Sequence, residues 1–267
     1  MNVFRVDSKF FGGRRYEVPG SWAEVTQEQL VMLCALQPDT GRVVPALMKA
    51  WMGMEDAVAD LLMPADWYAL ERWFAFALHP EGIDRLIVRR LELRQEGQTL
   101  LGPSDGFDGL TWEEFVYADS YAEAGLWEQV AAVLYRPERA DWDGESDRRV
   151  AFSRYGAGER VAAIRGLDRA VLEAVALNYR ALRLGFARRW PRIFQLAAGS
   201  KGGGAKGDLD AVDAEGKADG TERRQGVSWL TVSRHLLSDH FYEEGKLMGL
   251  SVGSVMFQLN EAAGRKR

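Results

Sequence analysis

Residues 168–189 read DRAVLEAVALNYRALRLGFARR, and this stretch predicts the longest helix of the chain. Its apolar side chains recur at steps of three or four residues, which places them on one face of a helix. They are Val171, Leu172, Val175, Tyr179, Leu182 and Phe186. Pro191 follows the last of them and ends the helix, since the residue before a proline disfavours the helical conformation. The stretch therefore indicates a protein built mainly from helices.

Further helix starts are marked by hydroxyl residues that precede Glu or Gln by three positions, the pattern of a capping box. Three such boxes occur, at Ser21–Glu24, Thr26–Gln29 and Thr111–Glu114. Pro64 suits the first turn of another helix. Together with the apolar periodicity, these signals predict helices near residues 43–52, 54–62, 64–78, 111–122, 126–135, 158–165 and 252–259.

Two segments carry strand signals instead. Residues 1–20 alternate apolar and polar side chains on both sides of Gly12-Gly13, which predicts a short hairpin or two loose strands. Residues 86–101 fit a hairpin that turns at Glu96-Gly97, but the same residues could extend a helix, and we favour the hairpin. The predicted fold class is thus mostly α, a multi-helix domain with a minor β-hairpin.

Composition divides the chain into three parts. Residues 199–226 hold 8 glycines in 28 positions and no aromatic residue. Such a segment buries too little apolar surface to offset its ordering entropy, so it is predicted to be a flexible linker. A helical body at 1–198 precedes it, and a small helical tail at 227–267 follows it. The tail is too short to hold much of a core, so it must dock on the body or on a partner.

The composition excludes several classes of function. The net charge of −5 argues against a dedicated nucleic-acid binder, and one cysteine excludes an internal disulfide. No basic segment followed by an apolar core begins the chain, and no apolar run approaches the ~20 residues of a membrane span, so we expect a cytoplasmic protein without a membrane partner. No nucleophile, base and orienting group can be assembled, so we expect no enzymatic activity, no cofactor and no metal.

The G-x-S-x-G pattern at Gly249–Gly253 favours a helix cap, and the acidic residues between Asp141 and Asp147 favour a solvated loop.

The candidate binding residues are basic and aromatic. Residues 160–194 carry eight arginines against two acidic residues, a local charge of +6. This Arg-rich helix is consistent with phosphate binding, with an acidic protein partner or with a plain solvated face. Trp229 marks the tail as a piece that needs a surface to pack on. The residues predicted to contact a partner are Arg180, Arg183, Arg188, Arg189, Arg192, Trp229, Phe241, Tyr242 and Phe257.

Four segments carry a resemblance to a known family. They are VPGSWAEVT at 18–26, GLTWEEFVYADSY at 109–121, VLYRP at 133–137 and WPRIF at 190–194. In this order, followed by a Gly-rich tether and a small tail, they resemble hypothetical proteins encoded among prophage tail genes and, through them, bacteriophage tail assembly chaperones. The likeness spans residues 18–196 and covers the tail only in outline. None of these motifs is catalytic.

The resemblance implies a non-enzymatic chaperone of tail morphogenesis in the bacterial cytoplasm. Its implied partners are the tape-measure protein and the tail-tube subunits, which such a chaperone binds transiently and then leaves. One alternative is a structural tail-completion protein that remains in the virion. Another is a nucleic-acid-binding regulator that uses the Arg-rich helix 168–192.

Overall fold

The computed structural model describes residues 1–8, 12–36, 43–104, 107, 109–144, 147–194, 229, 232–233 and 243–265. Its longer helices are α1 (Gln27–Ala35), α2 (Val43–Met52), α4 (Pro64–Phe74), α5 (Trp112–Glu123), α6 (Trp127–Leu134), α7 (Arg154–Ile164), α8 (Arg169–Arg189) and α12 (Val252–Arg265). Shorter helices are α3 (Asp56–Ala59), α11 (Glu244–Gly249) and the 3₁₀ turns η1 (Trp22–Glu24), η2 (Ala75–Leu78) and η3 (Pro80–Gly82). The strands are β1 (Asn2–Ser8), β2 (Gly12–Val18), β3 (Arg90–Leu93) and β4 (Gln98–Leu101). The prediction of a mostly helical protein is confirmed.

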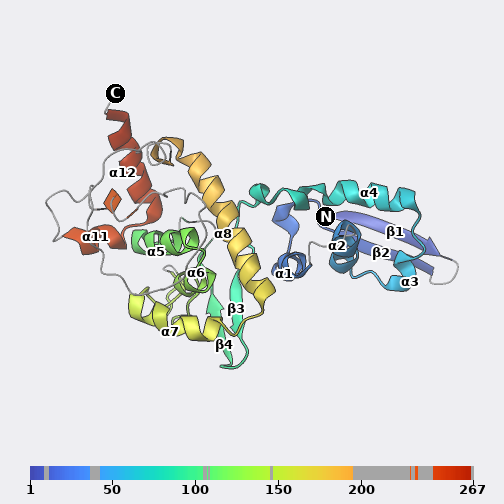
Figure 1. Ribbon diagram of the computed structural model, residues 1–267, viewed down its shortest axis with the longest axis horizontal. Helices are drawn as coiled ribbons and strands as arrows, with labels where there is room; N and C mark the ends of the chain where they lie inside the picture. Colours follow the sequence, from blue (N-terminus) through green and yellow to red (C-terminus); the bar gives the residue numbers. More distant parts are fainter. Residues whose placement is uncertain are drawn as a thin grey trace, which may run out of the picture.

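Helix α8 lies between two groups of elements (Figure 1). On one side lie the hairpin β1–β2 and helices α1 to α4, and on the other lie α5, α6, α7 and the C-terminal helices α11 and α12. Helix α8 packs on α1, η3 and α6. Its buried positions include Val175, Tyr179, Leu182 and Phe186, so the apolar face predicted for residues 168–189 is the face that packs.

A buried amide fixes α8 against the chain that leads into β3. Asn178 is 1% exposed. Its Oδ1 accepts hydrogen bonds from the backbone N–H of Ile87 (2.7 Å) and Val88 (3.0 Å), and its Nδ2 donates to the carbonyl of Arg85 (2.9 Å). Three backbone groups that lie outside the strands are thereby satisfied, which is why this polar side chain is tolerated on an apolar face.

Both predicted hairpins are present. In the first, Asn2 pairs with Val18 and Ser8 with Gly12, antiparallel. In the second, Arg90 pairs with Leu101 and Leu93 with Gln98, which decides residues 86–101 in favour of a hairpin. Gly97 lies in its turn with φ of +61°, a conformation that residues with a Cβ rarely adopt.

Two of the three predicted capping boxes are confirmed. Thr26 and Thr111 each accept a hydrogen bond from the N–H three residues later, and Gln29 and Glu114 return the bond. The box at Ser21 is wrong, because Ser21 makes no capping bond and only the short 3₁₀ turn η1 follows it. Glu24 instead accepts from the N–H of Gly20 (2.7 Å) and pairs with the amino terminus. The helix predicted over 54–62 is shorter, because α3 covers only Asp56–Ala59.

The described acidic residues of the loop at 138–149 are exposed, as predicted, but the basic residue at its end is buried. Arg149 is 2% exposed, and Asp147 accepts hydrogen bonds from its Nε (3.0 Å) and Nη2 (2.7 Å). Asp147 also pairs with Arg136 (3.0 Å), and both arginines face the buried carboxylate of Glu114 (2.6 and 3.2 Å). Asp147 thus keeps contact with solvent while it supplies, with Glu114, the counter-charge that two buried guanidinium groups need.

The C-terminal segment docks on the body. Beside α5, the N–H of Trp112 donates to the carbonyl of Leu250 (2.7 Å), and the N–H of Val252 donates to the carbonyl of Leu110 (3.1 Å). Ser251 caps α12 through its Oγ, which accepts from the N–H of Ser254 (3.2 Å), so the helix-cap interpretation of the G-x-S-x-G pattern is confirmed. The linker predicted at 199–226 lies outside the described residues.

Candidate partner-binding cleft

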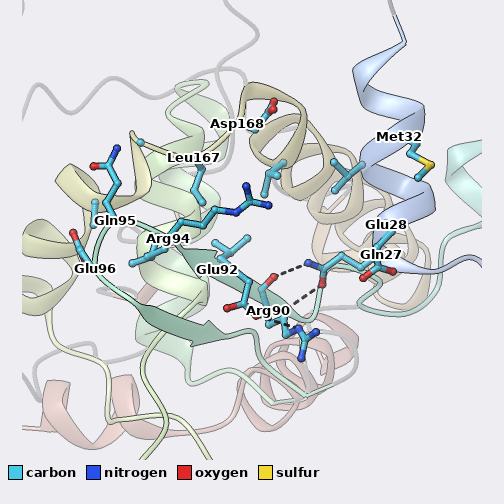
Figure 2. Close-up of a pocket in the computed structure, with 16 residues that line it drawn as sticks. Gln27, Glu28, Met32, Arg90, Glu92, Arg94, Gln95, Glu96, Leu167 and Asp168 are labelled. Carbon is cyan, nitrogen blue, oxygen red and sulfur yellow. Dashed lines mark hydrogen bonds and ion pairs between the residues drawn. The ribbon is translucent and has the colours of Figure 1, made fainter.

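The candidate functional site is a cleft of about 610 Å³ where three distant segments meet. We call it the α1–β3 cleft. Helix α1 forms one wall, the hairpin β3–β4 forms another, and the turn between α7 and α8 closes the third side (Figure 2). Its lining residues are Gln27, Glu28, Val31, Met32, Arg90–Glu96, Ala163, Gly166–Asp168 and Val171.

Gln27 fixes the wall formed by α1 to the wall formed by β3. Its Oε1 accepts hydrogen bonds from the N–H of Arg89 (2.9 Å) and Arg90 (3.2 Å), and its Nε2 donates to the carbonyl of Arg90 (2.8 Å). Figure 2 shows the bonds between Gln27 and Arg90 at the end of the cleft where α1 begins. Thr26, the residue before Gln27, caps α1 through its capping box. The first turn of α1 is therefore fixed by the cap as well as by the bonds of Gln27 to β3.

The interior of the cleft is apolar. Val31, Leu167 and Val171 are half-buried, and Met32 is 43% exposed. Helix α1 and the residue after it carry the apolar run Leu30–Leu36, of which Leu30 is fully buried and Val31, Leu33, Cys34 and Leu36 are half-buried. Val31 and Met32 therefore leave hydrophobic surface facing the cleft and the solvent. Such surface is typical of interaction sites.

Charged side chains surround the apolar interior. Four carboxylates (Glu28, Glu92, Glu96 and Asp168) and two arginines (Arg90 and Arg94) line the cleft, a formal net charge of −2. Arg90 pairs with Glu92 (3.3 Å). Figure 2 shows Arg94 extending from the hairpin across the cleft toward α8. The cleft thus combines apolar contact area with an acidic bias, which suits a partner that is apolar and basic.

A second cavity, of about 870 Å³, lies between the hairpin β3–β4 and the loop that carries Trp142. Four arginines line it, and three of them, Arg90, Arg148 and Arg149, form ion pairs within the chain. Arg148 pairs with Glu138 (2.5 Å) and stacks on Trp142, and Arg149 belongs to the buried cluster with Asp147. This cavity therefore offers less net charge to a ligand than its arginines suggest.

The arginines predicted to contact a partner differ in their surroundings. Arg183 pairs with Asp119 and with Glu123 (3.0 Å), so its charge is used within the body. Arg180 is exposed, and its guanidinium carbon lies 4.5 Å from the ring centroid of Trp127. Arg188, Arg189 and Arg192 are exposed near the C-terminal end of α8, where cations are favoured by the helix dipole.

Trp229, predicted as a partner contact, is buried in the protein itself. It is 1% exposed and packs edge-on against Trp112, Phe115 and Phe194, with ring centroids 5.3 to 5.7 Å apart. Its Nε1 donates to Asp119 (2.6 Å). The surface that Trp229 needs is therefore on the body. Of the other predicted contacts in the tail, Phe257 is 58% exposed, and Phe241 and Tyr242 lie outside the described residues.

The α1–β3 cleft could not be predicted from any single segment, because its walls lie about sixty residues apart in the chain. The apolar run Leu30–Leu36 was the available signal, since it exceeds what one small helix buries. Cys34 lies in this run, and burial, with a smaller contribution from Glu173, raises its pKa to about 11. The thiol is therefore protonated and unreactive near neutral pH.

Among the described residues, no three His, Cys, Asp or Glu side chains are grouped as metal ligands would be. Within the same residues, no helix is long and apolar enough to cross a membrane. No family model, curated protein or solved structure matches the chain.

Proposed function

We propose that the protein is a non-enzymatic chaperone of phage tail assembly, which holds an aggregation-prone tail protein in the α1–β3 cleft before that protein is incorporated. Its expected partners are the tape-measure protein and the tail-tube subunits, in the bacterial cytoplasm. The chaperone class rests on the resemblance of residues 18–196 to proteins of prophage tail gene clusters.

One observation carries the binding role. The α1–β3 cleft exposes apolar side chains of α1 and of the α7–α8 turn between charged walls. Apolar area supplies affinity for an unfolded or partly folded segment, while surrounding charges select among segments and speed the encounter. A cleft of this kind suits transient binding better than a flat apolar patch, which would also drive self-association.

The docked C-terminal segment leaves the α1–β3 cleft open to a partner. Trp229 and α12 occupy the surface of α5, so the apolar area that the isolated tail would expose is used within the chain. The α1–β3 cleft lies apart from this contact, on the side of the body that carries α1 and β3 (Figure 1). A partner could therefore enter the cleft without displacing the C-terminal helices.

Co-expression with the tape-measure protein of the same gene cluster tests the proposal. We expect the full chain to keep the tape-measure protein in the supernatant and to co-purify with it. Leu167→Asp places a charge in the apolar interior of the cleft and should abolish retention. The matched control is Tyr155→Asp, because Tyr155 is 79% exposed on α7 and does not line the cleft.

Retention that is equally strong with Leu167→Asp would contradict the assignment of the cleft. No retention by the unaltered chain would contradict the chaperone function. Mass spectrometry of purified particles separates the chaperone from a structural tail-completion protein, since a chaperone should be absent from the finished tail.

A further inference from the structure

We propose that the α1–β3 cleft binds its partner by strand addition, taking an extended, basic and apolar peptide segment onto the outer edge of β3. The choice of this cleft rests on the proposed function, but the geometry of the edge is independent of it. The argument follows from the direction of the backbone groups of β3, from its two faces and from the charge of its surroundings.

The register of the hairpin decides which backbone groups of β3 are free. In an antiparallel pair, opposite residues alternately bond to each other and point away from each other. Gly102 donates to the carbonyl of Arg89 (2.8 Å), so that pair is bonded. Leu101 instead exchanges hydrogen bonds with Arg136 (2.7 and 3.0 Å), so Leu101 and its opposite residue Arg90 point outward.

Two residues of β3 therefore present N–H and C=O groups to the cleft. Those of Arg90 are taken by the amide of Gln27, which bonds the strand as a neighbouring peptide group would. Glu92 lies two residues further and points the same way, and no described residue bonds to its N–H or C=O. On the outer edge of β3, the backbone groups of Arg90 are thus bonded by Gln27, and those of Glu92 are open toward the cleft.

An unpaired strand edge beside an apolar cleft is the geometry used in peptide binding by strand addition. Natural proteins generally shield such edges, because an exposed edge pairs with other chains. Here α1 and the α7–α8 turn flank the edge without covering it. A short extended segment would fit between these walls and bond to Glu92.

The two faces of β3 specify the side chains of the segment. Leu91 and Leu93 are buried on one face, and Arg90 and Glu92 are exposed on the other. An added strand continues both faces, because successive side chains point to opposite sides. Its apolar residues would lie with Leu93 and Val171, and its charged residues would lie beside Glu92, Glu28 and Glu96.

The charge of the cleft selects a basic segment. Glu28 and Glu96 carry no ion pair within the described residues, whereas Arg90 is already paired with Glu92. Opposite Glu92, a Lys or Arg of the added strand would supply the opposite charge across the strand pair, which is favourable, and the nearby carboxylates of Glu28, Glu96 and Asp168 outnumber the cation Arg94 that lies two residues beyond Glu92. We therefore identify the ligand as an extended peptide in which Lys or Arg alternates with Val, Ile or Leu.

The first test uses the labelled peptide acetyl-Lys-Val-Arg-Val-Lys-Val-amide and the full chain, with fluorescence anisotropy as the readout. Glu92→Pro removes the outward N–H and leaves the bonds between β3 and β4 intact, because residue 92 does not bond to β4. Thr99→Pro is the matched control, since Thr99 lies opposite Glu92 and its outward N–H faces away from the cleft. It also removes the hydrogen bond from Thr99 Oγ1 to the Glu92 carboxylate (2.6 Å), a bond that Glu92→Ala removes as well. Glu92→Ala removes the charge and keeps the N–H.

We expect Glu92→Pro to weaken peptide binding at least tenfold, Thr99→Pro to change it less than twofold and Glu92→Ala to weaken it less than fivefold. An acidic peptide, acetyl-Glu-Val-Glu-Val-Glu-Val-amide, should bind at least tenfold more weakly than the basic one. Equal losses in the two proline variants, or equal affinity for the two peptides, would overturn the proposal.

A second test leaves the protein unaltered. The basic peptide is N-methylated at residues 1, 3 and 5 or at residues 2, 4 and 6, so the two peptides have the same side chains. In an added strand only one of these sets of N–H groups faces β3. One methylated peptide should lose binding at least tenfold and the other less than threefold, and equal losses would overturn strand addition.

The outcomes for the two proposals are distinct. If Leu167→Asp abolishes retention of the tape-measure protein and Glu92→Pro does not, the cleft binds its partner without strand addition. If the peptide binds with the predicted pattern and the tape-measure protein is not retained, strand addition stands and the chaperone function fails.

Discussion

Asp119 is the point where three parts of the protein are joined, so its replacement by asparagine should be among the most damaging changes of a single charge. The carboxylate is 0% exposed. It accepts hydrogen bonds from Tyr179 Oη (3.1 Å), Arg183 Nη2 (2.9 Å) and Trp229 Nε1 (2.6 Å), and also from Arg183 Nε. Helix α5, helix α8 and the C-terminal segment therefore meet at one side chain.

The expected loss follows from these contacts. Asp119→Asn preserves the shape but removes the charge, and its amide Nδ2 is a donor that faces other donors. A hydrogen bond to a charged group contributes about 1.5–3 kcal/mol, and breaking a buried ion pair costs about 3–5 kcal/mol. Arg183 keeps 30% of its side-chain exposure and can be hydrated, which places the loss at the lower end. We expect the free energy of unfolding to fall by about 3 kcal/mol.

Urea unfolding followed by tryptophan fluorescence measures this loss, because Trp229 and Trp112 lie next to the altered group. Glu123→Gln is the control. Glu123 also pairs with Arg183, but its side chain is 35% exposed, so its change should cost less than about 1 kcal/mol. Equal effects of the two substitutions, or a loss below about 1 kcal/mol for Asp119→Asn, would refute the role of Asp119 as the joining group.

Three further predictions concern other parts of the chain. Cys34, with a pKa of about 11, should react with a thiol reagent at pH 8 about 100-fold more slowly than in the urea-unfolded chain, and equal rates would contradict its burial. Burial opposes the charge of Asp147, but hydrogen bonds from the side chain and N–H of Arg149 outweigh it and hold its pKa below the usual value. The lowered pKa stabilises the folded state at pH values above the unfolded-state pKa near 4, and this stabilisation is lost as the pH falls through the folded-state pKa. Asp147→Asn should therefore reduce the drop in the urea midpoint between pH 6 and pH 3. An unchanged drop would contradict this role of Asp147. Gln27→Ala removes three bonds to the backbone at 89–90 and should lower the free energy of unfolding by about 1–2 kcal/mol in urea, whereas the solvent-exposed Glu28→Ala should change it by less than about 0.5 kcal/mol.

Local signals in the sequence were sufficient for most of the secondary structure. The apolar period of residues 168–189 located α8, and the hydroxyl residues Thr26 and Thr111 located two helix starts. Ser21 carried the same signal and failed, because a capping box also needs a helix long enough to use it, and only a single 3₁₀ turn follows.

The contacts between distant segments could not be predicted in the same way. The buried cluster of Glu114, Arg136, Asp147 and Arg149 joins a helix, the strand-like segment after α6 and a loop, and each of these residues is unremarkable in its own neighbourhood. The same holds for Trp229, whose aromatic partners come from α5 and from the end of the body. Its need for a surface was clear from the sequence, but which surface it uses depends on the tertiary fold.

The α1–β3 cleft is the extreme case. Gln27 is a common residue at the start of a helix, and only the fold shows that its amide occupies the edge of β3 and leaves Glu92 open. The functional interpretation therefore changes from an Arg-rich helix face to a cleft with an acidic bias. Charge counts along the chain favoured the arginines of α8, but several of these arginines have partners within the protein.

The most direct test of the partner-binding account is the retention of the tape-measure protein by the full chain, compared with Leu167→Asp and Tyr155→Asp. Both substitutions add one negative charge at a side chain on or next to α7, but only Leu167 lines the cleft. The account predicts retention by the unaltered chain and by Tyr155→Asp, and loss with Leu167→Asp while its unfolding transition remains cooperative. Loss with both variants, or with neither, would contradict it.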